Sequence, residues 1–381
     1  MKIFCVLLCI LLLTGCAAAP EAAETEAAET VMTVETVPAT TAPKETTPPD
    51  PIREMLNQMS LEERVGQLFL ARCEDATALN DIGQYHLGGF VLFGADFRDQ
   101  TPNSIREKLA AYQAAAKIPL LIAVDEEGGT VNRVSLYPAF RESKFASPRD
   151  LYAWGGMEWV LATEEEKCQL LTSLGINVNL GPVCDISTEY SAFMYDRSLG
   201  QDAEITSQFV SGTVQLMNSY HLGSALKHFP GYGNNADTHT GIAIDSRSLE
   251  ELEGNDLIPF AAGIDAGCVA VLVSHTIVES LDMVLPASLS PAVHQYLRED
   301  MGFEGVILTD DLVMQAITDQ YGAGEAAVMA VLAGNDLLCS TDYATQYEAV
   351  LAAVLEGRID IDVLNSAVRN VLEWKIELGL L

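Results

Sequence analysis

The sequence predicts one α/β domain over residues 51–381, a (β/α)8 barrel of the TIM type. Eight short apolar runs recur along this part of the chain, and amphipathic stretches long enough for helices lie between them. Near-continuous apolar runs are typical of strands that are buried on both faces of a parallel sheet. Eight such units in about 330 residues match this barrel. A doubly wound open sheet is the alternative, because a count of units does not prove that the sheet closes.

The predicted strands are short and evenly distributed along the chain. They cover residues 65–71, 88–93, 119–125, 176–183, 223–229, 269–276, 304–310 and 335–340. The predicted crossover helices include 102–117, 202–220, 248–265 and 343–356. After the eighth run the sequence is helix-like as far as Leu381, so we expect no second catalytic domain.

The first fifty residues differ from the rest. Residues 1–16 have a charged start and an apolar run too short to span a bilayer, which is typical of a signal peptide. The run ends in Leu-Thr-Gly-Cys, which resembles a bacterial lipobox and implies lipidation of Cys16. An ordinary secretory signal is the alternative. Residues 17–50 are almost entirely Ala, Glu, Thr, Pro and Val, so we expect a disordered linker.

These features predict an extracytoplasmic protein, held to a bacterial cell membrane only through a lipid anchor. The amino-acid composition further limits the kinds of molecule that the protein is expected to bind. The chain has 54 acidic against 21 basic residues, a formal net charge of −33, which excludes a nucleic-acid-binding protein. Its five cysteines beyond residue 16 are widely spaced and form no C-x-x-C pair, so we expect buried free thiols. The sequence indicates no metal site and no cofactor, and it leaves the oligomeric state open.

Several polar side chains fall where predicted strands end. Asp125 ends the third run, Lys227 and His228 lie at the end of the fifth, and Asp310 ends the seventh. Functional side chains of a (β/α)8 barrel lie at these carboxyl ends and in the loops that follow. The loop 230–239 has a proline and two glycines in its first four residues, so its backbone is unusually free. The sequence therefore predicts a site at this end of the barrel.

Segments in four regions of the predicted barrel resemble motifs of one enzyme family. The string KHFPGYGNNADTH, residues 227–239, resembles the signature of the β-N-acetylhexosaminidases of glycoside hydrolase family 3. The segments VDEEGGTVNR at 124–133 and GVILTDDLVM at 305–314 resemble the third-strand and nucleophile motifs of that family. LGPVCDI at 180–186 and YDRSLG at 195–200 match its fourth-strand region. The resemblance extends along the whole barrel and implies a glycosidase.

The resemblance assigns roles to individual residues. It implies that Asp310 is the nucleophile and that His239, paired with Asp237, is the acid/base. Histidine suits this task because its ordinary pKa, near 6.5, lets it donate and accept protons at neutral pH. The implied substrate-binding residues are Asp125, Arg133, Arg197, Lys227 and His228. Asp311, next to the nucleophile, is expected to support it or to cap a helix.

Two positions depart from the family pattern: Thr130 replaces its usual arginine, and Tyr232 its frequent histidine. Both put substrate preference in question. We expect an exo-acting, retaining enzyme that releases terminal β-linked N-acetylglucosamine from muropeptides or chitooligosaccharides. Three alternatives remain open: a β-N-acetylglucosaminide phosphorylase, a β-glucosidase of the same family, and a non-catalytic glycan-binding lipoprotein. A phosphorylase is considered because a neutral histidine, unlike a glutamate, does not repel a phosphate anion.

Overall fold

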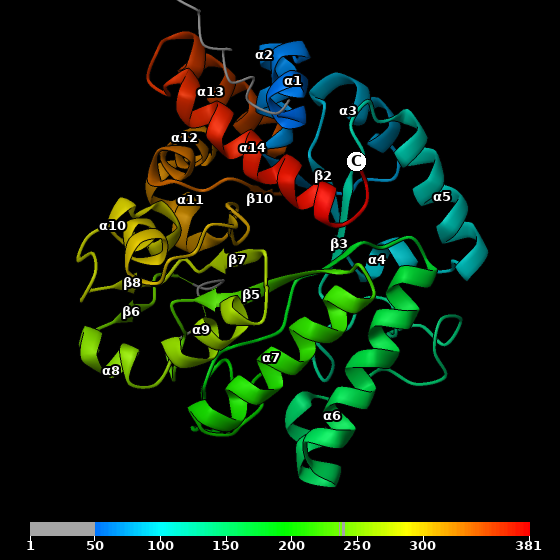
Figure 1. Cartoon of the computed structure of the whole chain (residues 1–381), viewed down its shortest axis with the longest axis vertical. Coiled ribbons are helices and arrows are strands. Elements are labelled where there is room, and N and C mark those ends of the chain that lie inside the picture. The colour runs from blue at the N-terminus through cyan, green and yellow to red at the C-terminus, as the bar shows by residue number, and fades with distance from the viewer. Residues whose placement is uncertain (1–49, 236, 238–240) are drawn as a thin grey trace, which may run out of the picture. The chain divides into compact units, whose positions relative to one another are not determined.

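The computed structural model of the chain describes residues 50–235, 237 and 241–381. Eight parallel strands form a barrel surrounded by helices (Figure 1). The strands are β1 (Phe69–Arg72), β2 (Gly89–Leu92), β3 (Leu121–Val124), β4 (Val178–Asn179), β5 (Gly223–Phe229), β7 (Ala270–Val273), β9 (Val306–Thr309) and β10 (Leu338–Ser340). Their order in the sheet is β10-β1-β2-β3-β4-β5-β7-β9. A parallel bridge between Leu308 and Leu337 joins the two ends, so the barrel prediction is confirmed over the open sheet.

Helices alternate with these strands. The long ones are α5 (Pro102–Ala115), α6 (Pro148–Ser173), α7 (Ala203–Ser219), α12 (Ala323–Ala333), α13 (Tyr343–Leu355) and α14 (Ile361–Glu377). The shorter ones are α1 (Pro51–Gln58), α2 (Leu61–Gln67), α3 (Ala78–Tyr85), α4 (Gly94–Phe97), α8 (Leu249–Glu253), α9 (Leu257–Asp265), α10 (Pro291–Gln295) and α11 (Gln315–Tyr321). A separate two-stranded sheet pairs β6 (Ile244–Asp245) with β8 (Ile277–Val278). Capping side chains, such as Asp202 before α7, explain where several helices begin.

The structure corrects three details of the predicted elements. The first apolar run, 65–71, begins inside α2, because Val65 faces the core from a helix and the strand starts only at Phe69. The predicted helix 248–265 is two helices, α8 and α9, separated by a short connection. The sequence did not predict α6, whose helical geometry is interrupted at Gly155 and Gly156.

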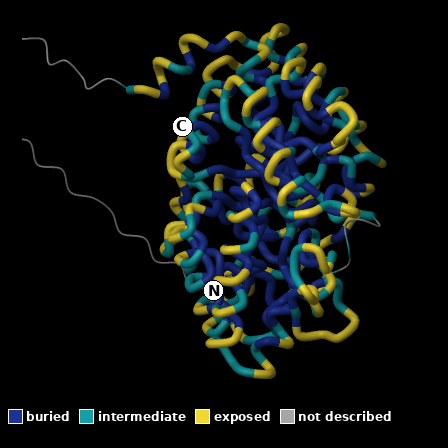
Figure 2. Tube along the Cα trace, turned by 90° about the vertical axis from the view of Figure 1, so that its right-hand side faces the viewer, coloured by how far each residue is buried: buried dark blue, intermediate teal, exposed yellow. Residues whose placement is uncertain are grey.

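Apolar side chains fill the barrel interior, and Figure 2 shows the buried residues gathered inside the exposed ones. Leu70, Val91, Ala123, Leu272 and Leu308 come from five different strands. Helix α14, in red in Figure 1, adds Val371 and Trp374 to the same cluster. A Cβ atom on Gly223, the first residue of β5, would lie 2.9 Å from the Trp374 ring. Trp374 therefore closes the amino end of the barrel and leaves the carboxyl end for a site.

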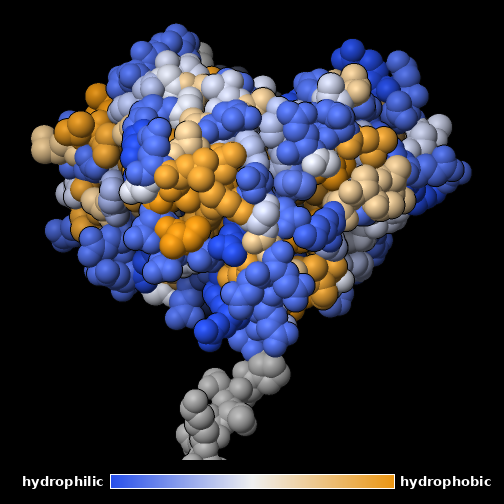
Figure 3. Space-filling view, turned by 90° about the horizontal axis from the view of Figure 1, so that it is seen from above, coloured by the Kyte–Doolittle hydropathy of each residue, from blue (hydrophilic) through white to orange (hydrophobic). Residues whose placement is uncertain are grey.

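The folded unit begins at Asp50, which the sequence had assigned to the linker. Its carboxylate accepts a hydrogen bond from the Arg53 backbone and pairs with Arg369 of α14 at 2.8 Å. All five cysteines in the described part of the chain are free and buried, as expected. Among the described residues, no helix has both the length and the apolar character needed to span a membrane. The face seen in Figure 3 is mostly hydrophilic, with separate apolar patches.

Candidate active site

A pocket of about 940 Å³ lies at the carboxyl end of the barrel strands. Each of the eight strands contributes a lining residue, either from the strand itself or from just beyond it. These residues are Arg72, Phe93, Asp125, Leu180, Lys227, Leu272, Asp310 and Cys339. The side chains of a parallel barrel converge at this end, so residues far apart in the sequence meet there.

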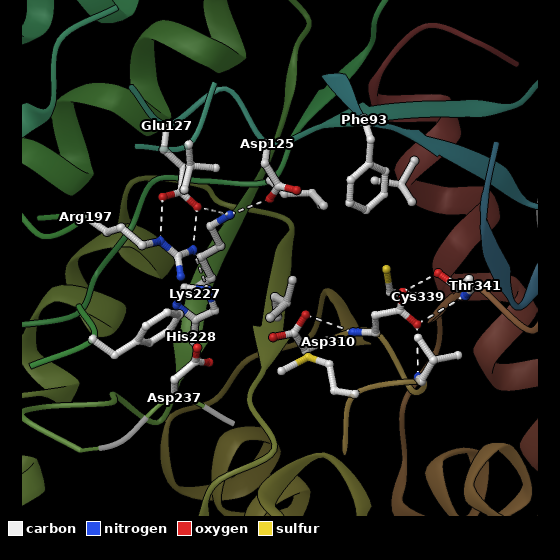
Figure 4. A pocket seen from close by; sticks show the side chains of 18 of the residues that line it. Phe93, Asp125, Glu127, Arg197, Lys227, His228, Asp237, Asp310, Cys339 and Thr341 are labelled. Atoms are coloured by element: carbon white, nitrogen blue, oxygen red, sulfur yellow. Dashed lines mark hydrogen bonds and ion pairs between the residues drawn. The ribbon is translucent and has the colours of Figure 1, made fainter. Parts of the chain in front are cut away.

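Asp310 follows β9 directly. Its backbone N–H donates to the carbonyl of Val273 on the neighbouring strand β7 at 3.1 Å, so the strand pairing continues as far as this residue. Its Oδ1 atom accepts a hydrogen bond from the backbone N–H of Asp311 at 2.8 Å. Figure 4 shows the carboxylate of Asp310 directed into the pocket. A short side chain at the end of a barrel strand is held with little positional freedom.

Asp311 supports the loop that follows β9. Its carboxylate accepts hydrogen bonds from the backbone of Val313 at 3.1 Å and from the Thr341 hydroxyl at 2.6 Å. Helix α11 begins later and is preceded by Met314, so Asp311 does not cap that helix. Burial raises the pKa of Asp311, while the bonds from Thr341 lower it and offset part of this effect. Asp311 thus joins the loop after β9 to the loop after β10.

Four charged side chains form a cluster that we call the charged cluster: Asp125, Glu127, Arg197 and Lys227 (Figure 4). The ammonium of Lys227 lies 2.7 Å from Asp125 Oδ1 and 2.6 Å from Glu127 Oε1. The guanidinium of Arg197 donates to both oxygens of Glu127, at 2.6 Å and 2.9 Å. Such two-point pairing fixes the plane of the guanidinium as well as its position.

The charges of this cluster stabilise one another. Burial on its own raises the pKa of Glu127, but Arg197 and Lys227 outweigh it, so that pKa lies well below its ordinary value. Burial on its own lowers the pKa of Lys227, but Asp125 and Glu127 raise it above the ordinary value. The pKa of Arg197 is raised for the same reason, chiefly by Glu127. All three groups therefore remain charged, although Glu127 and Lys227 are buried and Arg197 is only slightly exposed.

Arg133 reaches the same pocket from the loop after β3. Its guanidinium lies 3.7 Å from Asp125 Oδ2 and 5.2 Å from the centre of the Phe93 ring. The backbone of this loop is held from within by Glu126, which is fully buried. The Glu126 carboxylate accepts hydrogen bonds from the backbone N–H groups of Arg133 at 2.8 Å and of Val134 at 2.7 Å. A buried carboxylate thus fixes the segment from which Arg133 extends.

His228, on strand β5, and Tyr232 and Asp237, in the loop after that strand, belong to the pocket lining. In this loop, Gly231 has a φ of 113°, a left-handed conformation that side chains rarely adopt, and an added Cβ would lie 2.8 Å from Asp256. Figure 4 places Asp237 near His228, on the pocket side of this loop. The predicted acid/base His239 lies outside the described residues, as does the predicted lipidation site Cys16.

The structure therefore brings together the predicted residues that it describes: Asp310, Asp237, Asp125, Arg133, Arg197, Lys227 and His228. It also adds lining residues that the sequence analysis did not single out: Arg72, Phe93, Glu127, Phe193, Asp196 and Thr341. Glu127 could have been found, since it is the second glutamate of the VDEEGG motif. Phe93 and Thr341 carry no comparable signal, because they are ordinary residues at strand ends.

Among the described residues, one group has the geometry of potential metal ligands: Cys73, Asp75 and Asp96. Both carboxylates already have cationic partners. Lys108 lies 3.0 Å from Asp75, and Arg72 lies 2.9 Å from Asp96. These contacts give the two carboxylates an ordinary structural role in ion pairs.

Comparison with known proteins shows which enzyme family this chain is similar to. Residues 60–374 match the model of the glycosyl hydrolase family 3 N-terminal domain. A β-hexosaminidase of Xanthomonas campestris pv. campestris is 33% identical over 301 residues, which cover 76% of this chain and 87% of that protein. A β-hexosaminidase of Nitrosomonas eutropha is 31% identical over 261 residues, which cover 66% of this chain and 73% of that protein.

Solved structures share the fold. A glycoside hydrolase family 3 β-N-acetylglucosaminidase from Paenibacillus sp. superposes with a TM-score of 0.79 at 31% identity. The match covers 84% of this chain and 63% of the Paenibacillus chain. A glycosyl hydrolase of the same family from Mycobacterium smegmatis superposes with a TM-score of 0.76 at 27% identity and covers 84% of this chain and 98% of that one.

Proposed function

The chain belongs to glycosyl hydrolase family 3, and we propose that it is an exo-acting, retaining β-N-acetylhexosaminidase. We propose terminal β-linked N-acetylglucosamine of muropeptides or chitooligosaccharides as its substrate. The observation that carries the proposal is the pocket itself. It combines the carboxylate of Asp310 at a strand end with the charged cluster, whose ionised groups can bind sugar hydroxyls. The β-hexosaminidase names of the relatives support the same activity.

The proposed reaction proceeds in two steps. Asp310 attacks the anomeric carbon as the bond to the leaving oxygen breaks, and that oxygen takes a proton from His239. The sugar is then bound to Asp310 as an ester. Water attacks the same carbon in the second step, gives its proton to His239 and releases Asp310. Asp237 would orient the imidazole and stabilise its charged form, as an aspartate does in a Ser-His-Asp triad.

The remaining groups would hold the terminal sugar. Asp125 can accept hydrogen bonds from two hydroxyls, while Lys227 and Arg197 donate charge-assisted bonds. Glu127 holds these two cations in place and, with an exposure of 7%, is the least accessible carboxylate of the charged cluster. We assign Glu127 to positioning and Asp125 to direct sugar contact.

The setting of this activity is a proposal as well. We propose that Cys16 is lipidated and that residues 17–49 link the anchor to the barrel. The enzyme would then work outside the cytoplasmic membrane, where cell-wall fragments and external chitooligosaccharides are accessible.

The first test is turnover of 4-nitrophenyl glycosides. We expect hydrolysis of the β-N-acetylglucosaminide and little of the β-glucoside, with β-configured N-acetylglucosamine as the first product. Asp310→Ala should abolish turnover on every substrate because the ester cannot form. The matched control is Asp319→Asn, which changes an exposed carboxylate on α11. Preferred cleavage of the glucoside, formation of a sugar phosphate with added phosphate, or binding without turnover would each favour one alternative.

The second test separates the acid/base from the nucleophile. His239→Ala should lose about 10²–10⁴-fold on chitobiose, whose leaving oxygen needs a proton. It should lose much less on a dinitrophenyl glycoside, whose leaving group departs unprotonated. Azide needs no base, so it should then accelerate turnover and yield the β-glycosyl azide. Equal losses on both substrates, with no effect of azide, would show that His239 is not the acid/base.

A further inference from the structure

Asp185 lies in the loop after β4, within the motif LGPVCDI, and the mechanism above gives it no role. Its carboxylate is almost fully buried, with an exposure of 1%. One oxygen accepts hydrogen bonds from the backbone N–H of His228 at 3.1 Å and from its ring atom Nδ1 at 2.7 Å. The other accepts the backbone N–H of Tyr232 at 2.7 Å. This side chain therefore connects the β4 loop with the segment that leads toward Asp237.

These bonds determine the tautomer of His228. Both oxygens of Asp185 already accept backbone N–H groups, so the carboxylate acts as an acceptor and Nδ1 carries the proton. The other ring nitrogen, Nε2, lies 3.1 Å from Nη2 of Arg197. A guanidinium can only donate, so Nε2 accepts this bond and carries no proton. The alternative tautomer would direct an N–H group at another N–H group.

The effect of this tautomer continues into the charged cluster. The same guanidinium that donates to His228 also donates to both oxygens of Glu127. The His228 ring is further enclosed by Tyr232, whose ring centre lies 5.4 Å away at an angle of 88°. Asp185 thus acts on His228, and His228 acts on Arg197. Both of these side chains line the pocket.

We propose that Asp185 is a positioning residue for glycoside cleavage. It fixes the tautomer of His228, aligns Arg197 with the substrate through that ring, and anchors the start of the loop that leads toward Asp237. The claim that the aligned groups contact a sugar rests on the proposed function. The claim about the tautomer rests on the hydrogen bonds alone.

Asp185→Asn tests the proposal with a minimal change of shape. An asparagine has one acceptor oxygen and one NH2 group, so it cannot accept hydrogen bonds from both His228 and the backbone N–H of Tyr232. If the NH2 group faces His228, Nδ1 must accept a hydrogen bond and the proton moves to Nε2. The Nε2–H group then points at the N–H group of Arg197, and two donors face each other. If it faces Tyr232, the start of the loop loses its acceptor. We expect kcat/KM on the 4-nitrophenyl N-acetylglucosaminide to fall about 10- to 100-fold, the usual effect of losing an orienting partner.

Asp336→Asn is the matched control. Asp336 is also a buried aspartate, with an exposure of 4%, but it precedes β10 at the opposite end of the barrel. It accepts hydrogen bonds from the backbone of Ile307 at 2.8 Å and from Arg298 at 2.7 Å. This variant should lose thermal stability as well, while kcat and KM per folded molecule stay unchanged. Equal kinetic losses in both variants would reduce Asp185 to a structural residue and overturn the proposal.

A double-mutant cycle shows whether Asp185 acts through His228. In a His228→Ala background the further change Asp185→Asn should cost clearly less than it does in the wild type, because the ring is absent and only the backbone contacts of Asp185 can still be lost. A full additional loss would contradict a role through this ring.

The tautomer itself can be observed without turnover and without a variant at Asp185. In ¹⁵N-histidine-labelled wild-type protein, His228, identified by its loss in His228→Gln, should show a protonated Nδ1 and an unprotonated Nε2. A protonated Nε2 in the wild type would overturn the proposal even if the enzyme is active. If the wild type instead shows the expected tautomer but cleaves no N-acetylglucosaminide, the proposed function fails and the structural claim stands.

Discussion

Lys375 is a buried lysine whose environment differs from those of Lys167 and Lys227. Lys167 lies 2.6 Å from the carboxylate of Glu164, and Lys227 has two carboxylate partners. The ammonium of Lys375, on α14, donates to the amide oxygen of Gln67 at 2.6 Å. Among the described residues, no carboxylate lies within ion-pair distance of it. Burial lowers the pKa of Lys375 from 10.5 to about 7. We predict that Lys375→Met stabilises the protein at neutral pH.

The magnitude follows from the shift. Between about pH 7 and 10.5 the unfolded chain binds the proton more strongly than the folded protein, so the free energy of unfolding rises with pH across this window. At pH 7 the shift corresponds to a destabilisation of about 4 kcal/mol relative to an uncharged side chain. Methionine removes this term but leaves the Gln67 oxygen without its donor, which costs about 1–3 kcal/mol. The expected net gain at pH 7 is about 1–3 kcal/mol.

Urea unfolding of the wild type and the variant at pH 7 and pH 9.5 measures this difference. The midpoint of the variant should be higher at pH 7 with an unchanged slope, and its advantage should decrease by about 3 kcal/mol at pH 9.5. Lys167→Met is the control, since it leaves Glu164 buried without its partner and should destabilise by about 3–5 kcal/mol. A less stable Lys375→Met at pH 7, with the pH dependence of the wild type, would refute the reasoning.

Two further predictions concern the amino-terminal segment. Removal of residues 1–49 should leave a folded protein with full kcat and KM on 4-nitrophenyl N-acetylglucosaminide, because the segment has no apolar periodicity and the folded unit begins at Asp50. A loss of more than a few-fold per mole would contradict a linker role. Cys16→Ser should shift the protein from the membrane fraction to the soluble fraction when both are probed by immunoblotting, because lipidation needs this thiol. Unchanged partitioning of the variant would refute the lipid anchor.

The fold could be predicted because buried parallel strands have a simple sequence pattern. Seven of the eight predicted runs contain a whole barrel strand, and the first run, 65–71, overlaps β1 except for Arg72. The errors arise where the same apolar pattern occurs in a helix and in a strand. The run 65–71 joins the core-facing end of α2 to β1, and apolar character alone cannot separate them. Helix α6 was not predicted because the glycine pair at 155–156 interrupts its periodicity and separates a short segment, 148–154, from a longer one, 157–173.

The site could be predicted in part, for a different reason. Asp125, Lys227 and Asp310 could be predicted because each lies at the end of a predicted strand. The carboxyl ends of the strands lie close together in a parallel barrel. Which residues pair with which is a three-dimensional property: Asp125 and Lys227 are 102 positions apart yet lie 2.7 Å from each other. The VDEEGG motif contains Glu127, but the role of this carboxylate becomes visible only in the folded structure, where it pairs with both Lys227 and Arg197. The sequence does not show these two partners in advance.

The charged cluster also bears on how activity depends on pH. The pKa of Glu127 is lowered, and those of Arg197 and Lys227 are raised, so the cluster keeps these three charges throughout the neutral range. Groups that do not titrate cannot produce the limbs of a pH–rate profile. Those limbs must therefore come from other groups, and in the proposed mechanism the acid/base histidine is the one suited to neutral pH. In the proposed mechanism, the charges of Glu127, Arg197 and Lys227 therefore stay constant while the acid/base histidine changes its protonation state. This separation lets substrate binding and proton transfer be distinguished by comparing the pH profiles of KM and kcat.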